Sequence, residues 1–257
     1  MDKPLVLCET VEHIAILTLN HPEKRNALSR ALLASLKEHL ARIANDKNVK
    51  VVILRAAGPV FSAGHDLREL VGGDEAEYAT LFALCTEVME AIRKLPQPVI
   101  AQVQGLATAA GCQLVATCDL VVAAEDASFA TPGVKIGLFC TTPAVALVRA
   151  VMPKKAMEML LTGGPISAQE GERAGLVNRV VAPDRLAEET GKLAQQICAA
   201  SSFTVALGKK AFYAQLPLDR PTAYQVAQEA MVQNAVATDA QEGMRAFLEK
   251  RPPKWKS

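Results

Sequence analysis

The chain has 257 residues, and its composition, 50% hydrophobic and 21% charged, excludes a disordered protein and supplies enough apolar side chains for a large core. Its 28 basic residues nearly balance 27 acidic ones, and no long basic block occurs outside residues 250–256, so nucleic acid and membrane surfaces are poor partners. No apolar run reaches the about 20 residues that span a bilayer, and the first residues lack a secretory pattern, so we expect a cytoplasmic protein, or a mitochondrial-matrix one if a targeting segment was removed.

The N-terminal half alternates between predicted strands and helices. Residues 5–10 and 13–19 predict two antiparallel strands, and residues 49–54 predict a third. Ser29 is expected to cap a helix whose apolar residues follow the 3.6-residue period. A second amphipathic helix follows Gly72 and ends before Pro96. The apolar faces comprise Leu32, Leu33, Leu36, Leu40 and Ile43 in the first helix and Tyr78, Leu81, Phe82, Cys85, Val88, Met89 and Ile92 in the second.

A turn of small residues follows the next predicted strand, at residues 99–103, and leads directly into a helix, after which residues 120–124 predict another strand. The backbone N–H groups of Ala109, Ala110 and Gly111 are expected at the N-terminus of that helix, where they have no intrahelical acceptor. Such groups, together with the positive end of the helix dipole, favour developing negative charge. The turn therefore predicts an oxyanion hole.

Helices dominate the predicted C-terminal half. They are expected at residues 143–151, 154–161, 167–174 and 185–199, with Ser167 and Glu170 as a capping box, and only residues 176–181 read as extended. Three further helices are predicted at residues 204–216, 221–236 and 239–250. Their apolar stripes exceed what one terminal layer needs, so we expect this segment to pack against another subunit.

Neither the cysteines nor the histidines form a cluster in the sequence. The six cysteines lie in apolar surroundings with no C-x-x-C pair, and the four histidines are scattered. We therefore expect reduced thiols, no metal site and no permanently bound cofactor.

Motifs spread over almost the whole chain share their order and spacing with a known family. Residues 20–28 read Asn-His-Pro-Glu-Lys-Arg-Asn-Ala-Leu, and residues 61–67 read Phe-Ser-Ala-Gly-His-Asp-Leu. Residues 105–119 centre on Ala-Gly-Cys-Gln-Leu, and residues 159–177 contain Leu-Thr-Gly and Ala-Gly-Leu-Val. Glu-Gly-Met at 242–244 is followed by Phe247, Lys250 and Arg251. Together they resemble the crotonase (enoyl-CoA hydratase/isomerase) superfamily, and within it the enoyl-CoA hydratase domain-containing branch that lacks both catalytic glutamates.

The resemblance implies an α/β fold, with a ββα spiral core at residues 1–200 and a helical segment at residues 201–257 that forms a homotrimer or a dimer of trimers. It implies an acyl-CoA thioester as partner, with coenzyme A as part of the substrate. The backbone N–H groups of His65 and Ala110 would hold the thioester carbonyl and stabilise an enolate. Coenzyme A contacts are implied for Lys24, Arg25, Ala63, Asp66, Leu67, Arg68 and Gly111, and for Phe247 and Lys250 of a neighbouring subunit. Without the resemblance, the charged members of this set read as solvated surface side chains.

Two positions depart from the pattern of the family's hydratases, which handle the added water with two glutamates matching Gln113 and Gly133. An amide does not titrate near neutral pH and glycine has no side chain, so we expect isomerase or lyase activity rather than standard hydration. Gln113 could still orient a water or a carbonyl, or be a satisfied polar side chain beside the pocket. If only the two acid–base groups are missing, glutamates at both positions should restore hydration.

Alternatives remain open from the sequence. The loop around His65 resembles that of methylmalonyl-CoA decarboxylase, so His65 could serve a decarboxylase, or contribute only its backbone N–H. A non-catalytic acyl-CoA-binding protein is a second alternative, and a dinucleotide reductase is disfavoured because no G-x-G-x-x-G follows the first strand. Cys140, at a predicted helix start, is either a thiol of lowered pKa or an apolar pocket residue. Asp119 and Glu125 are expected to be solvated or to cap backbone.

Overall fold

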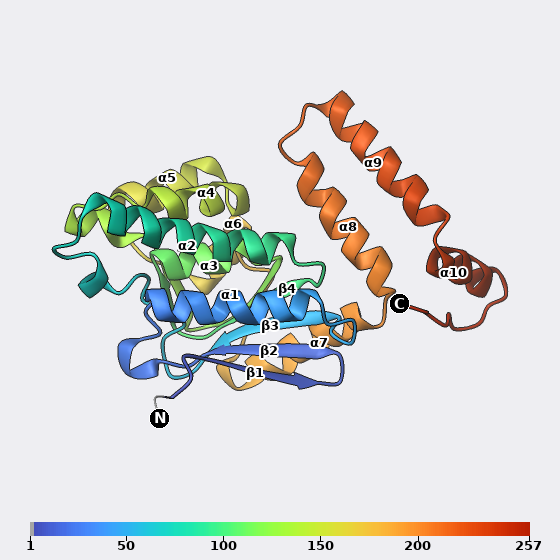
Figure 1. The fold of residues 1–257 in the computed structure, drawn as a ribbon, viewed down its shortest axis with the longest axis horizontal. Helices are drawn as coiled ribbons and strands as arrows, with labels where there is room; N and C mark the ends of the chain where they lie inside the picture. The colour runs from blue at the N-terminus through green and yellow to red at the C-terminus, as the bar shows by residue number, and fades with distance from the viewer. Residues whose placement is uncertain (1–2) are drawn as a thin grey trace.

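The computed structural model describes residues 3–257 and is built around a six-stranded sheet (Figure 1). In spatial order its strands are β1 (Val6–Val11), β2 (Ile14–Leu19), β3 (Val51–Ala56), β4 (Val99–Val103), β6 (Leu120–Ala124) and β9 (Arg179–Val181). β1 is antiparallel to β2, and the other neighbours are parallel. A smaller sheet comprises β5 (Leu106–Thr108), β7 (Ser128–Ala130) and β8 (Ile166–Ser167). The α/β class and the first five predicted strands of the large sheet are confirmed, whereas the smaller sheet was not predicted.

Both faces of the large sheet are buried, which explains the unbroken apolar run of β3. Val52 and Leu54 belong to the main core with helices α1 (Arg30–Ala44) and α2 (Glu75–Lys94). Val51 and Ile53 point to the other face, where they pack with residues of α7 (Leu186–Cys198). Successive side chains of a strand alternate between faces, so a strand covered on both sides must be apolar throughout.

Helix α1 follows the sequence prediction closely. The Ser29 hydroxyl accepts a hydrogen bond from the Leu32 N–H at 3.2 Å, which satisfies one of the free donors at the helix start. All five predicted core residues of this helix are buried. Helix α2 begins with a capping box between Asp74 and Glu77 that the prediction did not include, and its Tyr78 and Phe82 lie at the margin of the core.

The remaining elements connect the sheet to the C-terminal end. The α-helices of this part are α3 (Ala110–Thr117), α4 (Thr141–Ala150), α5 (Pro153–Thr162) and α6 (Ala168–Ala174). Short 3-10 helices occur along the whole chain, at Pro22–Lys24, Leu67–Glu69, Pro132–Ile136 and Pro183–Arg185. The capping box of Ser167 and Glu170 is confirmed. The strand predicted at 176–181 is only partly right, because Leu176 donates to Gly171 at 2.8 Å and closes the end of α6. Pairing with β6 begins at Arg179.

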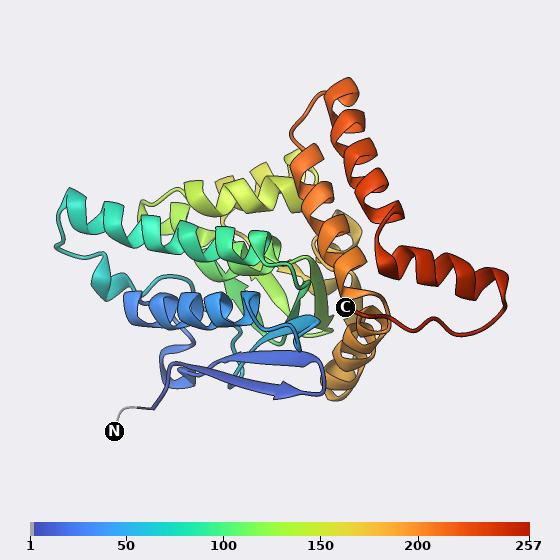
Figure 2. The same cartoon turned by 45° about the vertical axis from the view of Figure 1, so that its right-hand side comes forward.

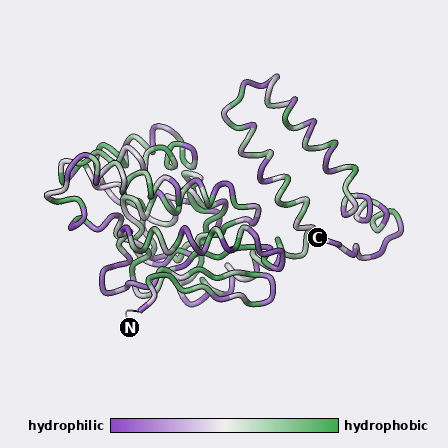
Figure 3. Tube along the Cα trace, viewed as in Figure 1, coloured by the Kyte–Doolittle hydropathy of each residue, from purple (hydrophilic) through white to green (hydrophobic). Residues whose placement is uncertain are grey.

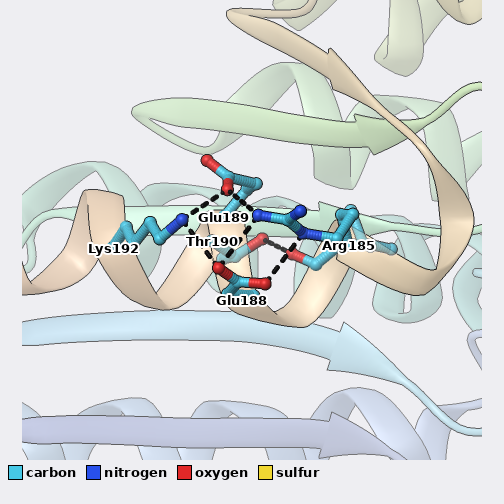
Figure 4. A network of polar contacts seen from close by, with 6 residues as sticks. Arg185, Glu188, Glu189, Thr190 and Lys192 are labelled. Carbon is cyan, nitrogen blue, oxygen red and sulfur yellow. Dashed lines mark hydrogen bonds and ion pairs between the residues drawn. The ribbon is translucent and has the colours of Figure 1, made fainter.

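The outer surface of α7 carries a chain of ion pairs near its first turns (Figure 4). Arg185 and Lys192 both contact Glu188 and Glu189, with nitrogen–oxygen distances between 2.7 and 3.2 Å. On the same helix the buried Thr190 hydroxyl donates to the Leu186 carbonyl at 2.8 Å. The exposed pairs stabilise little, because solvent screens them, so burial of the inner face holds α7 on the sheet.

Three helices extend away from the core: α8 (Ser202–Gln215), α9 (Arg220–Ala235) and α10 (Thr238–Leu248) (Figures 1 and 2). α9 packs along α8, and hydrophobic residues recur along all three helices (Figure 3). Within this segment the large apolar side chains exposed in the single chain are Phe203, Phe212, Leu216, Leu218, Tyr224, Met231, Val232, Val236, Met244, Phe247 and Leu248.

Candidate active site

The two predicted oxyanion segments lie against each other. β5 pairs with Ser62, since Thr108 N–H donates to the Ser62 carbonyl at 2.9 Å and Ser62 N–H donates to Leu106 at 3.2 Å. α3 begins two residues after β5, at Ala110. The loop that follows Ser62 is thereby held beside the first turn of α3.

Glycine makes this close approach possible. A Cβ on Gly64 would lie 2.8 Å from the Ala109 Cβ and 3.0 Å from the Thr108 carbonyl, and its φ of +85° is strained for other residues. A Cβ on Gly111 would lie 2.6 Å from the Ser62 carbonyl oxygen. The positions of the backbone N–H groups therefore depend on two residues without side chains.

Of the predicted backbone N–H groups, those of Ala110, Gly111 and His65 have no acceptor within residues 3–257. Ala109 is not one of them, because its N–H donates to the Ala130 carbonyl at 2.9 Å, so the prediction for Ala109 is wrong. The N–H of Ala110 opens α3 and has no intrahelical acceptor. No hydrogen bond within residues 3–257 uses the N–H of His65. His65 and Ala110 line the same pocket.

That pocket has a volume of about 430 Å³, and most of its lining is apolar. Ala63 and Leu67, two other residues predicted for the site, also line it. Its remaining lining residues are Leu70, Phe82, Ala109, Pro132, Gly133, Lys135, Ile136, Leu138, Phe139, Cys140, Thr141, Thr142 and Pro143. Among residues 3–257 this lining contains no carboxylate, so the pocket offers an apolar wall beside the backbone donors.

The His65 ring is held in one orientation. Its Nδ1 lies 3.2 Å from the Leu28 carbonyl oxygen, which fixes Nδ1 as the donor and leaves the lone pair on Nε2. Nε2 is buried and has no partner within residues 3–257, and the Phe82 ring packs edge-on at 5.6 Å. Burial lowers the pKa of His65. The ring is therefore neutral at pH 7 and presents an acceptor nitrogen.

The two positions that match the hydratase glutamates lie in different surroundings. Gln113 is one turn beyond Ala110 on α3, is only 5% exposed, and lines a separate cavity of about 220 Å³. At Gly133, a Cβ would lie 2.1 Å from the Leu138 carbonyl oxygen and 2.7 Å from the Cys140 sulfur. A glutamate at Gly133 has to displace this turn. We therefore no longer expect glutamates at positions 113 and 133 to restore hydration.

Cys140 lies at the N-cap of α4 but does not behave as an activated thiol. Its side chain is buried in the pocket wall, and burial raises the pKa of Cys140 above its ordinary value. Because the thiolate is the reactive form, the geometry favours an apolar pocket-lining role. Within residues 3–257 no group of His, Cys, Asp or Glu is arranged to hold a metal ion, and all six cysteines are free.

The residues predicted to contact coenzyme A are spread over three regions. Lys24 and Arg25 are exposed next to the pocket loop, since Ala63 N–H donates to the Arg25 carbonyl at 3.0 Å. Asp66 accepts from the Arg68 guanidinium at 2.9 Å, and this hydrogen bond lowers the pKa of Asp66. Phe247, 83% exposed, lies in the last turn of α10, and Lys250 follows its end; α10 extends away from the core (Figure 2).

Comparison with known proteins places this fold and site in a family. The family model described as enoyl-CoA hydratase/isomerase matches residues 9–257, nearly the full length. The chain belongs to the enoyl-CoA hydratase/isomerase family. The resemblance seen in the motifs is thereby confirmed, and the crotonase fold it implied is that of the family's solved structures.

Several members of the enoyl-CoA hydratase/isomerase family are close in sequence and structure. The rat mitochondrial enoyl-CoA hydratase domain-containing protein 3 is 54% identical over 93% of this chain and 80% of its own length. The human protein is 52% identical over 95% of this chain and 81% of its own. An enoyl-CoA hydratase structure from Mycobacterium smegmatis superposes with a TM-score of 0.97 at 49% identity, covering 99% of this chain and 100% of that one. The human domain-containing protein 3 structure has a TM-score of 0.96 at 51% identity, covering 98% and 100%.

Each described helix, from Arg30 at the start of α1 to Leu248 at the end of α10, is too short or too polar to cross a membrane.

Proposed function

We propose that the protein binds an acyl-CoA thioester and stabilises the enolate formed from it, with the thioester oxygen between the N–H groups of His65 and Ala110. The observation that carries this proposal is that both donors open onto one apolar pocket. Fixed donors in a water-poor site are aligned before the charge develops, so the reaction does not have to reorient them. One such donor typically contributes about 3 to 4 kcal/mol to the barrier.

His65 supplies the proton-transfer group in this proposal. His65 lines the pocket, its neutral Nε2 is a buried acceptor without a partner within residues 3–257, and the described lining offers no carboxylate in competition. Nε2 takes a proton from the carbon next to the thioester, and the electron pair moves to the oxygen held by the two N–H groups. Return of that proton to the same or a neighbouring carbon gives exchange or double-bond isomerisation. Standard hydration in the family uses two carboxylates, and the described lining contains none.

Exchange of the α-protons of butyryl-CoA in D₂O tests the proposal, because it reports enolate formation without assuming the final product. We expect His65→Gln to lower the exchange rate by about 10² to 10⁴-fold, the usual contribution of a general base, with unchanged coenzyme A affinity. Because burial lowers the pKa of His65, the wild-type rate should stay level through neutral pH and fall only below the ordinary histidine value of about 6.5. His39→Gln, on α1, is the matched control.

Three results would contradict parts of the proposal. Binding of acyl-CoA without exchange or turnover would indicate a non-catalytic acyl-CoA-binding protein. Conversion of a malonyl-type thioester without exchange of butyryl-CoA would indicate a decarboxylase that forms the enolate by loss of CO₂. A crotonyl-CoA hydration rate typical of the family would show an acid–base pair that the proposal, with His65 alone, does not contain.

We further propose that Lys24, Arg25, Ala63, Asp66, Leu67, Arg68 and Gly111 lie along the coenzyme A path, with Phe247 and Lys250 supplied by a neighbouring subunit. The exposed apolar side chains of α8–α10 support a homotrimer or a dimer of trimers, because such a surface is usually covered. Native mass measurement should give three or six times 27.4 kDa, and a stable monomer would contradict it. A cytoplasmic location stays a prediction, and the mitochondrial names of the rat and human relatives support the matrix alternative.

A further inference from the structure

The proposed thioester pocket and the second cavity adjoin along three helices. On α3, Ala110 lines the first pocket, whereas Gln113 and Thr117 line the second. These residues are spaced i, i+3 and i+7, so they lie on one face of the helix. Across about seven residues at 1.5 Å rise each, this face extends roughly 10 Å.

Helices α2 and α4 show the same progression. On α2, Phe82 lines the first pocket and Thr86 and Arg93 line the second. On α4, Thr142 lines both cavities and Arg149, seven residues later, lines only the second. The two cavities therefore adjoin at Thr142 and form a row, here called the trough, with the proposed backbone donors at one end.

The far end of the trough is positively charged. No carboxylate within residues 3–257 lies within 4.0 Å of Arg93 or Arg149. The Arg93 guanidinium lies over the Tyr213 ring at 3.6 Å, and Arg149 donates to the Val145 carbonyl of its own helix at 2.7 Å. Glu90, the carboxylate of this cavity, is paired with Lys94 at 3.2 Å.

Gln113 adds an independent sign of a missing ligand. Its side chain is 5% exposed and lines the second cavity, and its buried Oε1 accepts no hydrogen bond from any of residues 3–257. A buried amide without a partner costs free energy that a polar ligand group would offset. The two guanidinium groups are donors suited to a carboxylate, and the Gln113 amide can donate through Nε2 while its Oε1 accepts from a water or hydroxyl that accompanies the ligand.

We propose that the substrate class is an ω-carboxyacyl-CoA, the monothioester of a straight-chain dicarboxylic acid. The thioester lies at His65 and Ala110, the methylene chain lies along the trough past Thr142, and the free carboxylate is bound by Arg93, Arg149 and Gln113. This inference rests on the proposed acyl-CoA function and adds the chemistry of the distal end. It also assigns Gln113 a binding role in place of the acid–base role of the family's glutamate.

Calorimetric titration with matched pairs of thioesters tests the inference. The pairs are hexanoyl- and adipoyl-CoA, octanoyl- and suberoyl-CoA, and decanoyl- and sebacoyl-CoA. At the chain length that fits the trough, the ω-carboxylate should tighten binding about tenfold or more, since a charge-assisted hydrogen bond contributes about 1.5 to 3 kcal/mol. Arg149→Gln and Arg93→Gln should remove this difference and leave the monocarboxylic partner unchanged.

The controls separate this inference from the function on which it rests. Arg173→Gln removes an exposed guanidinium on α6, away from both cavities, and should change neither member of a pair. If no thioester binds more tightly than free coenzyme A, the proposed function itself fails. If monocarboxylic thioesters bind and the ω-carboxylate adds nothing at any length, this inference is overturned and the proposed function stands. If Arg93→Gln disturbs Tyr213, Arg149→Gln decides the test, because the one hydrogen bond of the Arg149 side chain within residues 3–257 is to Val145 of its own helix.

Discussion

Gly64→Ala is expected to lower the α-proton exchange rate of butyryl-CoA by about 10² to 10³-fold, the loss that follows removal of one oxyanion donor. The new methyl group would lie 2.8 Å from the Ala109 Cβ and 3.3 Å from the Ala110 nitrogen. It therefore separates the loop of His65 from the start of α3 and moves the two N–H groups apart. The measurement is exchange in D₂O, with coenzyme A affinity determined alongside.

Gly72→Ala is the matched control for this prediction. Gly72 has a φ of +79°, close to the +85° of Gly64, but a Cβ there meets nothing within 4 Å. Both variants carry the conformational cost of alanine at positive φ, and only Gly64→Ala crowds the proposed oxyanion hole. Full exchange activity in Gly64→Ala, or an equal loss in Gly72→Ala, would show that this close approach does not position the donors.

The sheet and its covering helices could be predicted because their signals are local. The β3 run at residues 51–54 is apolar on both faces, and the cap at Ser29 precedes a regular 3.6-residue stripe. Such patterns depend on neighbours within a few residues. The short strands β7 and β8 carry no comparable pattern, because they exist only through pairing with segments distant in the sequence.

The site was predicted in part for the same reason. His65 and Ala110 could be placed by motif, but the pairing of the Ala109 N–H with Ala130 depends on the register of β5 against β7. The lack of space at Gly133 arises because the chain folds back and brings the Leu138 carbonyl against it, and no local sequence pattern predicts this contact. The second cavity beside Gln113 requires three helices to be aligned, which a single sequence does not show.

Asp119 is the residue whose role the sequence underestimated most. It was expected to be solvated or to cap backbone, and it does accept from the Val99 N–H at 2.7 Å. It also pairs with Lys209 of α8 at 2.7 Å and accepts from the Tyr213 hydroxyl at 2.7 Å. The side chains of Asp119 and Lys209 are only 13% and 7% exposed. A carboxylate at the start of β6 thus ties the C-terminal helices to the core.

Asp119→Ala is accordingly expected to lower the free energy of unfolding by about 3 to 5 kcal/mol, the usual result of removing one partner from a buried ion pair. The Lys209 ammonium would keep the Ile92 and Gln97 carbonyls at 3.1 and 3.0 Å but lose its counter-charge. Burial already lowers the pKa of Lys209 despite Asp119, so the ammonium has little solvent to replace that partner. Urea unfolding at fixed protein concentration measures the loss.

A double-mutant cycle with Lys209→Met distinguishes this pair from a general packing effect. Each single variant leaves one buried charge without its partner, whereas Asp119→Ala combined with Lys209→Met removes both charges. The double variant should therefore lose clearly less stability than the sum of the single losses. Additive losses would contradict a stabilising Asp119–Lys209 pair, because they would mean that the two residues stabilise the fold independently. With the pair intact, α8 is held on the core while its apolar side remains exposed for the neighbouring subunit that the proposed trimer requires.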